Sequence, residues 1–246
     1  MPLREELEKA GHWFFRWRSY LPLLMVGLAL IAFREFHYPF GSQLLDDLWE
    51  IFCLTVSMAG IILRALTVGF VPKGTSDRNT KGQVAEELNT TGMYSIVRNP
   101  LYLGNFIIWL GVSLLVRLWW FSLIVILIFC LYYERIIFAE EEFLRGKFGR
   151  LYLEWAEKTP LFFPKFDGWR RPPLSFSWRT ALKGEYSGFF AIIVTFSLLE
   201  IVGDYFAEGV WEFDTMWQVI SFLGLFVYVV LRIMKKSNLL DVEGRP

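Results

Sequence analysis

TTGMYSIVRNPLYLGN, residues 90–105, passes from a polar run into a hydrophobic one within a few positions. Gly92 lets the chain turn tightly, because glycine adopts positive φ angles without steric cost. Pro100 suits the first turn of a helix and disfavours helical angles at the preceding residue. The stretch therefore predicts a helix beginning at Pro100, with Arg98 and Asn99 at an N-terminus that favours anions. The alternative is that Arg98 is only an interfacial anchor.

The chain around this stretch has the composition of a membrane protein. Of its 246 residues, 54% are hydrophobic and 18% are aromatic, and the mean hydropathy is +0.39. Soluble domains rarely carry apolar runs that approach the ~20 residues needed to cross a bilayer. We therefore predict an all-α, polytopic membrane helix bundle with about six transmembrane helices, the third and fourth forming a tight hairpin around Arg117. The predicted spans are residues 20–34, 47–70, 100–116, 118–138, 187–203 and 215–233.

Basic residues are unevenly placed along the chain, although lysine plus arginine and aspartate plus glutamate number 25 each. Four lie in residues 1–20, four in 71–99, ten in 134–185 and four from Arg232 onward, together 22 of the 25. The positive-inside rule then places both termini and both long loops in the cytoplasm. We expect an integral protein of the inner or plasma membrane whose active site faces the cytoplasm.

A second candidate segment, YYERIIFAEEEFLRGKFGRLYLEWAEKTPLFFPKF, covers residues 132–166. It follows the fourth predicted span without a helix breaker, so the helix is expected to leave the membrane into the cytoplasmic catalytic loops. A surface-lying amphipathic helix is expected to follow, ended by Pro160 and Pro164. Glu140, Glu141 and Glu142 lie where this helix passes the headgroup zone. At least one of the three carboxylates can face the protein interior and a cationic partner. The alternative is an exposed acidic collar.

Together the two segments resemble the isoprenylcysteine carboxyl methyltransferase and phospholipid methyltransferase superfamily of integral membrane enzymes. GMYSIVRNPLYLG, residues 92–104, is similar to the family pattern G-x-Y-x-x-V-R-H-P-x-Y-x-G, with Asn99 in place of histidine. EEEFLRGKFGRLY, residues 140–152, is similar to E-E-x-x-L-x-x-x-F-G-x-x-Y. The resemblance covers roughly residues 70–166. It implies a methyltransferase core at 71–166, preceded by transmembrane helices at 1–70 and followed by an interfacial strap and two further spans at 167–246.

The resemblance also implies a cofactor, S-adenosyl-L-methionine, held in a cytoplasm-facing pocket, and a lipid-borne methyl acceptor. Arg98, Glu141 and Asn99 are then the expected catalytic residues. The carboxylate of Glu141 would face the cationic or amino end of the cofactor, and Arg98 would bind a carboxylate or an anionic acceptor through paired hydrogen bonds. The expected cofactor-binding residues are Tyr94, Val97, Arg98, Asn99, Pro100, Tyr102, Glu140 and Glu141.

Asn99 narrows the class of acceptor, because an amide forms hydrogen bonds but cannot act as an imidazole base. An anionic oxygen needs no proton removed, whereas an amine or thiol does. We therefore predict methylation of a phosphate or carboxylate oxygen on a lipid or lipidated substrate, for example a bacterial lipid A phosphate. Arg64, inside the second span, is expected to face a polar cavity with Glu134, Glu140 or the substrate as its partner. The predicted substrate-binding residues are Arg64, Lys73, Arg78, Asn79 and Lys81.

Three other functions remain open at this stage. The first is an isoprenylcysteine-type carboxyl, or small-thiol or amine, methyltransferase. The second is an NADPH-dependent membrane reductase of the sterol type, and the third is a non-enzymatic membrane protein with a degenerate pocket. We predict no nucleic-acid partner and no metal site, since Cys53 and Cys130 have no ligand neighbours at useful spacing. The acceptor, the leaflet from which it enters and the oligomeric state stay open.

Overall fold

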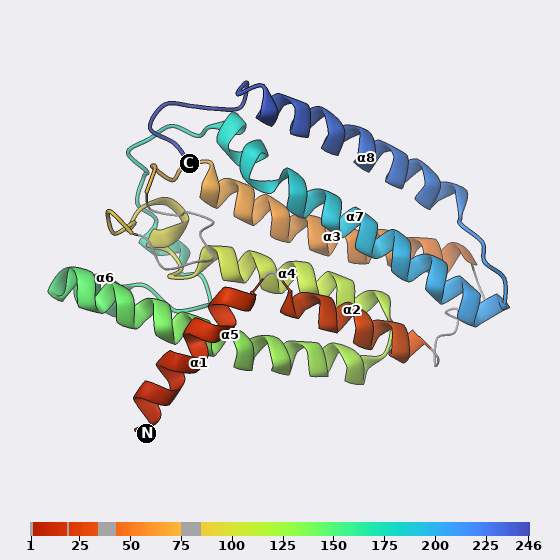
Figure 1. The fold of residues 1–246 in the computed structure, drawn as a ribbon, viewed down its shortest axis with the longest axis horizontal. Helices are drawn as coiled ribbons and strands as arrows, with labels where there is room; N and C mark the ends of the chain where they lie inside the picture. The colour runs from red at the N-terminus through yellow and green to blue at the C-terminus, as the bar shows by residue number, and fades with distance from the viewer. Residues whose placement is uncertain (1, 19, 34–42, 75–84) are drawn as a thin grey trace.

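The computed structural model describes residues 2–18, 20–33, 43–74 and 85–246, and within these ranges it is all-helical (Figure 1). The predicted fold class, a polytopic helix bundle, is confirmed. Two short 3-10 turns, η3 (Gly92–Ser95) and η4 (Phe166–Gly168), lie in the connections. The helices are α1 (Leu3–Trp17), α2 (Leu21–Ala32), α3 (Gln43–Val68), α4 (Pro100–Leu115), α5 (Trp119–Phe148), α6 (Arg150–Lys158), α7 (Trp178–Glu208) and α8 (Thr215–Lys236).

Four helices, α3, α5, α7 and α8, are long and apolar enough to cross a membrane. The two other predicted spans correspond to α2 and α4, which have 12 and 16 residues. At 1.5 Å per residue, α4 extends about 24 Å and α2 about 18 Å, less than a hydrocarbon core of about 30 Å. Each of the six predicted spans is therefore a helix, but two are shorter than a full crossing. Arg117, with φ +60°, makes the predicted tight hairpin between α4 and α5.

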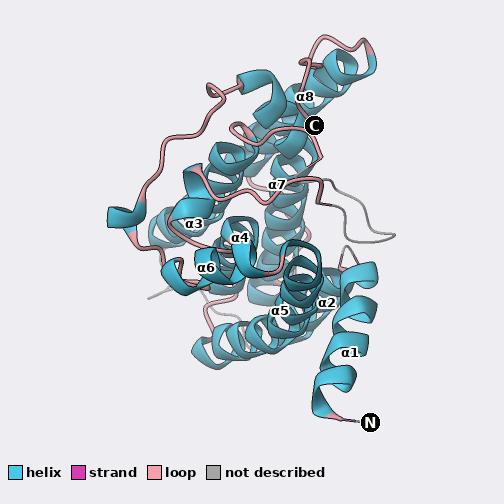
Figure 2. Cartoon of the chain, turned by 90° about the vertical axis from the view of Figure 1, so that its left-hand side faces the viewer, coloured by secondary structure: helices cyan, strands magenta, loops and turns pink. Residues whose placement is uncertain are grey.

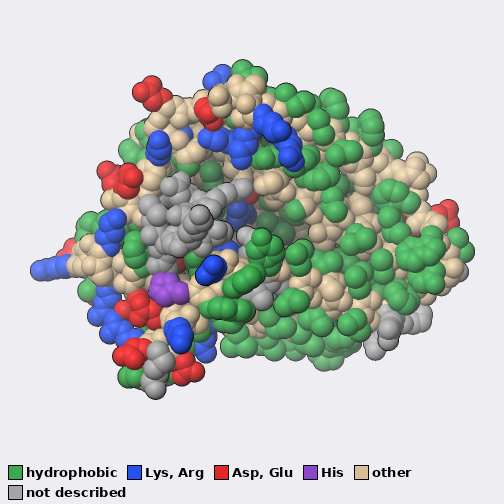
Figure 3. Space-filling view, viewed as in Figure 1, with side chains coloured by type: hydrophobic (Ala, Val, Ile, Leu, Met, Phe, Trp, Pro, Cys, Tyr) green, Lys and Arg blue, Asp and Glu red, His purple; other side chains and the backbone are tan. Residues whose placement is uncertain are grey.

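Apolar side chains cover most of the bundle surface, and charged ones gather at one end (Figure 3). On α8, for example, Phe222, Phe226 and Ile233 are exposed, as lipid-facing residues would be. We call the charged end, which carries α6 and both chain ends in Figure 1, the polar end of the bundle. The α7–α8 connection lies at the opposite end.

Helices α3 and α4 approach each other closely because small residues line their contact. A Cβ atom on Gly60 would lie 2.5 Å from the Gly104 carbonyl oxygen, and one on Gly111 would lie 2.2 Å from the Ser57 hydroxyl. At Gly104 a Cβ would lie 2.4 Å from the Cγ of Arg64. The glycine that ends the first motif therefore makes room for the stem of this arginine.

Two helix boundaries refine the sequence expectation. The helix that leaves the membrane ends at Gly149, whose φ of +53° separates α5 from α6, the helix at the place of the predicted amphipathic stretch. The predicted interfacial strap is helical from Trp178 onward, nine residues before the predicted span at 187. Its first turn is capped by Ser177, whose hydroxyl accepts a hydrogen bond from the Thr180 amide at 3.2 Å. A serine N-cap is a common helix start.

Viewed toward the polar end, α4 and α5 lie beside α6, with α1 along the outside of α5 (Figure 2). Helix α3 packs between α4 and α7, and α8 packs on α7. The ion pair between Arg4 and Glu142 joins α1 to α5. The other helices surround the polar ends of α3, α4 and α7. Both motifs lie at this end of the bundle.

Candidate functional site

A single cavity of about 840 Å³ lies between α3, α4 and α7 and reaches the polar end of the bundle. Its polar part is lined by residues of both motifs, including Arg98 and Glu140. Its inner part is apolar, with Ile108 and Val112 from α4 and Ile192 from α7. The cavity thus connects a polar, charged compartment to an apolar one inside the bundle.

The first motif is fixed by main-chain hydrogen bonds to the segment that follows α6. The Arg98 amide donates to the Pro160 carbonyl at 2.8 Å. The Lys165 amide donates to the Ile96 carbonyl, and the Gly92 amide to the Arg170 carbonyl, both at 2.9 Å. We call residues 159–170 the clamp segment. It holds the loop before α4, and thereby Arg98, in one position.

Arg98 and Glu141 form an ion pair between the two motifs, with Nη1 and Oε1 2.7 Å apart. Their side chains are 20% and 31% exposed, so the pair is only partly shielded from solvent. The hydroxyl of Tyr152 is buried beside it. Burial, and then the nearby Glu141 carboxylate, raise the pKa of Tyr152 well above its ordinary value, so the phenol stays neutral.

Glu140 faces the cavity, one residue before the carboxylate that pairs with Arg98. The Tyr102 hydroxyl donates to its Oε1 at 2.6 Å. Tyr102 is buried, and its ring packs on that of Tyr133 with centroids 4.7 Å apart. The two glutamates therefore have different surroundings, and Glu140 is the one that presents its carboxylate to the cavity.

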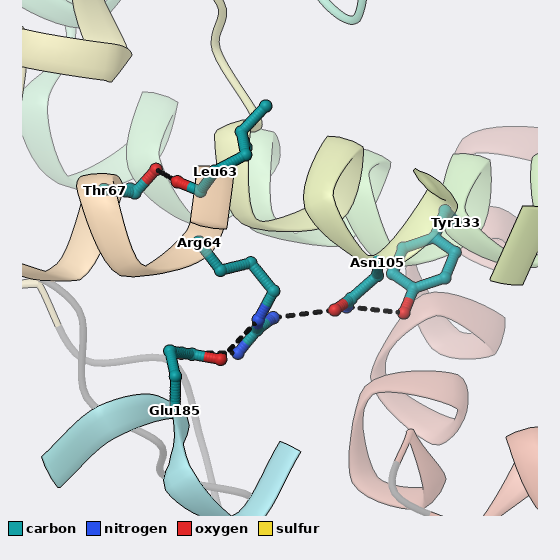
Figure 4. A network of polar contacts seen from close by, with 6 residues as sticks. All are labelled: Leu63, Arg64, Thr67, Asn105, Tyr133 and Glu185. Carbon is teal, nitrogen blue, oxygen red and sulfur yellow. Dashed lines mark hydrogen bonds and ion pairs between the residues drawn. The ribbon is translucent and has the colours of Figure 1, made fainter. Parts of the chain in front are cut away.

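A chain of hydrogen-bonded polar side chains lines the cavity (Figure 4). Arg64 donates to both carboxylate oxygens of Glu185, from Nε at 2.8 Å and from Nη2 at 3.0 Å. Its Nη1 donates to the Asn105 side-chain oxygen at 2.7 Å, and the amide nitrogen of Asn105 donates to the Tyr133 hydroxyl at 2.9 Å. The chain links α3, α4, α5 and α7, and all four residues line the cavity.

Most residues predicted for cofactor binding lie around the cavity. Val97 instead is fully buried in a small core, and Glu141 pairs with Arg98 without lining the cavity. Arg64 lines it as expected, but its partner is Glu185 rather than Glu134 or Glu140. Those that line it are Tyr94, Arg98, Asn99, Pro100, Tyr102 and Glu140.

The predicted substrate-binding loop gives a different result. The side chain of Lys73 is exposed and is not part of the cavity lining. Arg78, Asn79 and Lys81 lie outside the described residues. Sequence reasoning missed the basic residues that do line the cavity from the C-terminal helices, Lys183 on α7 and Lys235 on α8. It also missed Glu185, because the Ser177 helix cap was not recognised as the start of α7.

The cavity residues fit a ligand that carries both an anionic and a cationic group. The Arg98 guanidinium lines the cavity and uses one nitrogen for Glu141, so it has further N–H donors for an anion. Glu140 offers a carboxylate to a cation or an amino group. A volume of about 840 Å³ is within the range of small-molecule sites.

Comparisons with known proteins agree with this architecture. Residues 50–150 match the family model described as phospholipid methyltransferase. The chain is 31% identical over 148 residues to the nickel-cobalt-cadmium resistance protein NccN of Alcaligenes xylosoxydans xylosoxydans, covering 60% of this chain and 64% of the relative. It is 32% identical over 132 residues to the cobalt-zinc-cadmium resistance protein CzcN of Cupriavidus metallidurans, covering 53% and 58%. Each alignment thus spans less than two thirds of the relative's length. No solved structure matches the chain.

Fold and cavity define a helical membrane protein with a cavity of small-molecule size that reaches its polar end. The match of residues 50–150 to the phospholipid methyltransferase family model is consistent with the superfamily of integral membrane methyltransferases and confirms the resemblance carried by the two motifs. The match contains α4 and α5 entirely and most of α3, the helices that bring Arg64, Arg98 and Glu140 to the cavity.

Proposed function

We propose that this protein is an S-adenosyl-L-methionine-dependent methyltransferase that acts on an anionic oxygen of a membrane lipid or lipidated substrate. The observation that carries the proposal is the single cavity with two unlike parts. A polar cofactor can enter the part beside Arg98 and Glu140, and an acyl chain can occupy the part beside Val112 and Ile192. Their reactive groups would meet at the Arg64 network.

The cofactor supplies a methyl group on a positively charged sulfur. In the proposal the Arg98 guanidinium binds its carboxylate, and Glu140 accepts from its amino group or offsets its charge. Tyr102 holds the Glu140 carboxylate in place through the 2.6 Å hydrogen bond. Glu141 keeps Arg98 oriented, so it acts as a positioning residue.

Basic side chains from α3, α7 and α8 support an anionic acceptor. Arg64, Lys183 and Lys235 all line the cavity. Among the described residues of its lining there is no histidine or cysteine to act as a base. A phosphate or carboxylate oxygen needs none, because methylation forms the O–C bond while the S–C electron pair returns to sulfur, and no proton moves. The residues then act by positioning the acceptor and excluding water.

The names of the two relatives suggest a physiological setting for this chemistry. Both are called resistance proteins for divalent transition metals. Methylation of an anionic headgroup, such as a lipid A phosphate, removes a negative charge that would attract such cations. Within the proposal, the enzyme lowers the affinity of the membrane surface for metal ions.

Calorimetric titration of S-adenosylmethionine into the purified protein in detergent tests the cofactor assignment. We expect a micromolar Kd, or about 8 kcal/mol of binding free energy. Arg98→Ala and Glu140→Gln should each weaken binding at least about tenfold, whereas Glu141→Gln should weaken it less. Glu142→Gln is the matched control, because this neighbouring carboxylate pairs with Arg4 and lies outside the cavity.

Absence of binding to a demonstrably folded sample would refute the cofactor assignment, and NADPH would then test the reductase alternative. If S-adenosylmethionine binds, membranes incubated with cofactor labelled in the methyl group identify the acceptor. Label in a phosphate or carboxyl ester is the expected product. Label on nitrogen or sulfur would contradict the choice of an anionic oxygen.

A further inference from the structure

Three carboxylates meet at the end of the bundle opposite to the candidate active site. Glu200 and Asp204 lie one turn apart on the same face of α7, and Asp214 immediately precedes α8. One oxygen of each lies within 4.8 Å of one oxygen of both others. Asp214 occupies the N-cap position of α8, but its side chain accepts no capping hydrogen bond. Its carboxylate is therefore available to the other two.

The cluster is unusually well buried for three acidic side chains. Glu200 is 4% exposed and Asp204 is 9% exposed. The Oε2 atom of Glu200 is fully buried and has no hydrogen-bond partner among the described residues. A buried carboxylate oxygen without a partner is costly, so this atom calls for a partner beyond the described residues.

A fourth carboxylate approaches from α3. Glu50 is 5% exposed, and it lies near enough to Asp204 and Asp214 to be repelled by their charge. Its Oε2 accepts a hydrogen bond from the indole N–H of the fully buried Trp217 at 2.7 Å. That bond fixes the orientation of the Glu50 carboxylate toward the same end of the bundle. Among the described residues, no lysine or arginine forms a salt bridge with Glu50, Glu200 or Asp214.

Like charges in such surroundings persist only if a proton or a cation offsets them. Oxygens that bind one Ca²⁺ ion at about 2.4 Å cannot be more than about 4.8 Å apart, and the three oxygens satisfy this limit. The donors are all carboxylate oxygens, without His or Cys, which favours a hard cation over a soft one. We propose that Glu200, Asp204 and Asp214 form a binding site for a hard divalent cation, Ca²⁺ or Mn²⁺, with Glu50 as a supporting carboxylate.

Such an ion would join the end of α7 to the start of α8 and draw both toward α3. The sequence predicts no metal site, because nine residues separate Asp204 from Asp214 and their spacing fits no metal-binding motif considered above. The proposal is independent of the methyltransferase assignment, since the two sites lie at opposite ends of the bundle.

The test uses the full chain in detergent after treatment with a chelator. Ca²⁺ and Mn²⁺ are titrated separately, with thermal unfolding as one measurement and loss of the free Mn²⁺ electron paramagnetic resonance signal as the other. We expect one Mn²⁺ per chain and a saturable rise in Tm of about 5–10 °C at a hundredfold excess over Kd. Glu200→Gln and Asp214→Asn should each weaken binding at least about tenfold.

Glu200→Gln should also raise the Tm of the metal-free protein, because it removes one of the repelling charges. Asp167→Asn is the control, since this exposed carboxylate at the polar end should leave the ion response unchanged. An unresponsive wild type would overturn the proposal, and the carboxylates would then share protons instead. Equal Mn²⁺ binding by wild type and Glu200→Gln would overturn it as well. Binding of Zn²⁺ without measurable binding of Ca²⁺ or Mn²⁺ would overturn the assignment to hard cations.

Discussion

Replacing Glu185 by leucine leaves the Arg64 guanidinium in the cavity without its counter-charge. Glu185 is 5% exposed and receives two hydrogen bonds from Arg64, at 2.8 and 3.0 Å. Removing one partner of such a pair costs about 3–5 kcal/mol. Arg64 retains its bond to Asn105 and is 17% exposed, so we expect the lower end, about 3 kcal/mol. For a chain of this size, that lowers Tm by about 6–12 °C.

Thermal unfolding in detergent, followed by tryptophan fluorescence, measures this loss. The double variant Arg64→Met/Glu185→Leu should recover all but about 1.5 kcal/mol, because no unpaired charge remains and the methionine stem still packs over Gly104. Glu154→Leu is the control, since its pair with Arg150 is exposed and should contribute less than about 1 kcal/mol. A double variant no more stable than Glu185→Leu would refute the reasoning.

Three further predictions use the same preparation. Gly104→Ala should destabilise the protein by about 1–3 kcal/mol, because its Cβ would collide with the adjacent arginine stem, whereas Gly146→Ala, in open space on α5, should not. Burial raises the pKa of Tyr152, so the folded chain keeps a proton that the unfolded chain loses near pH 10. The wild-type protein should therefore lose stability between about pH 9 and about pH 10.5. The Tyr152→Phe variant should lose less stability over the same range. Asn99→His should change the Kd for S-adenosylmethionine less than about threefold, since an imidazole N–H can replace the amide donor to the Leu161 carbonyl; a tenfold loss would contradict this.

Much of the fold follows from one-dimensional patterns. Apolar runs locate the six helices of the bundle, and Pro100 locates the start of α4 to the residue. The positive φ of Gly92 was also predictable from its place at the start of the first motif. The break at Gly149 was not, because a glycine inside an apolar, helical pattern is often tolerated. Ser177 was overlooked because its capping role depends on a turn rather than on hydrophobic periodicity.

The candidate site was predictable only where one motif supplies it. Arg98 and Glu140 come from local patterns, and both line the cavity. Lys183, Glu185 and Lys235 come from helices that begin more than 70 residues after the first motif, and no spacing rule joins them to it. Which of the adjacent glutamates faces the cavity depends on the rotation of α5. That rotation is set by tertiary packing, which the sequence pattern does not specify.

The clamp segment has a consequence for how this protein can diverge. Three of its hydrogen bonds to the first motif join main-chain atoms at both ends. Such bonds depend on the path of the backbone, so substitutions at exposed positions of the segment, such as Phe163 and Phe166, can accumulate over evolution without moving Arg98. An inserted or deleted residue would shift every bond beyond it. Evolution must therefore keep the length of the clamp segment. Alignments that score only residue identity will underestimate how strongly selection constrains this segment.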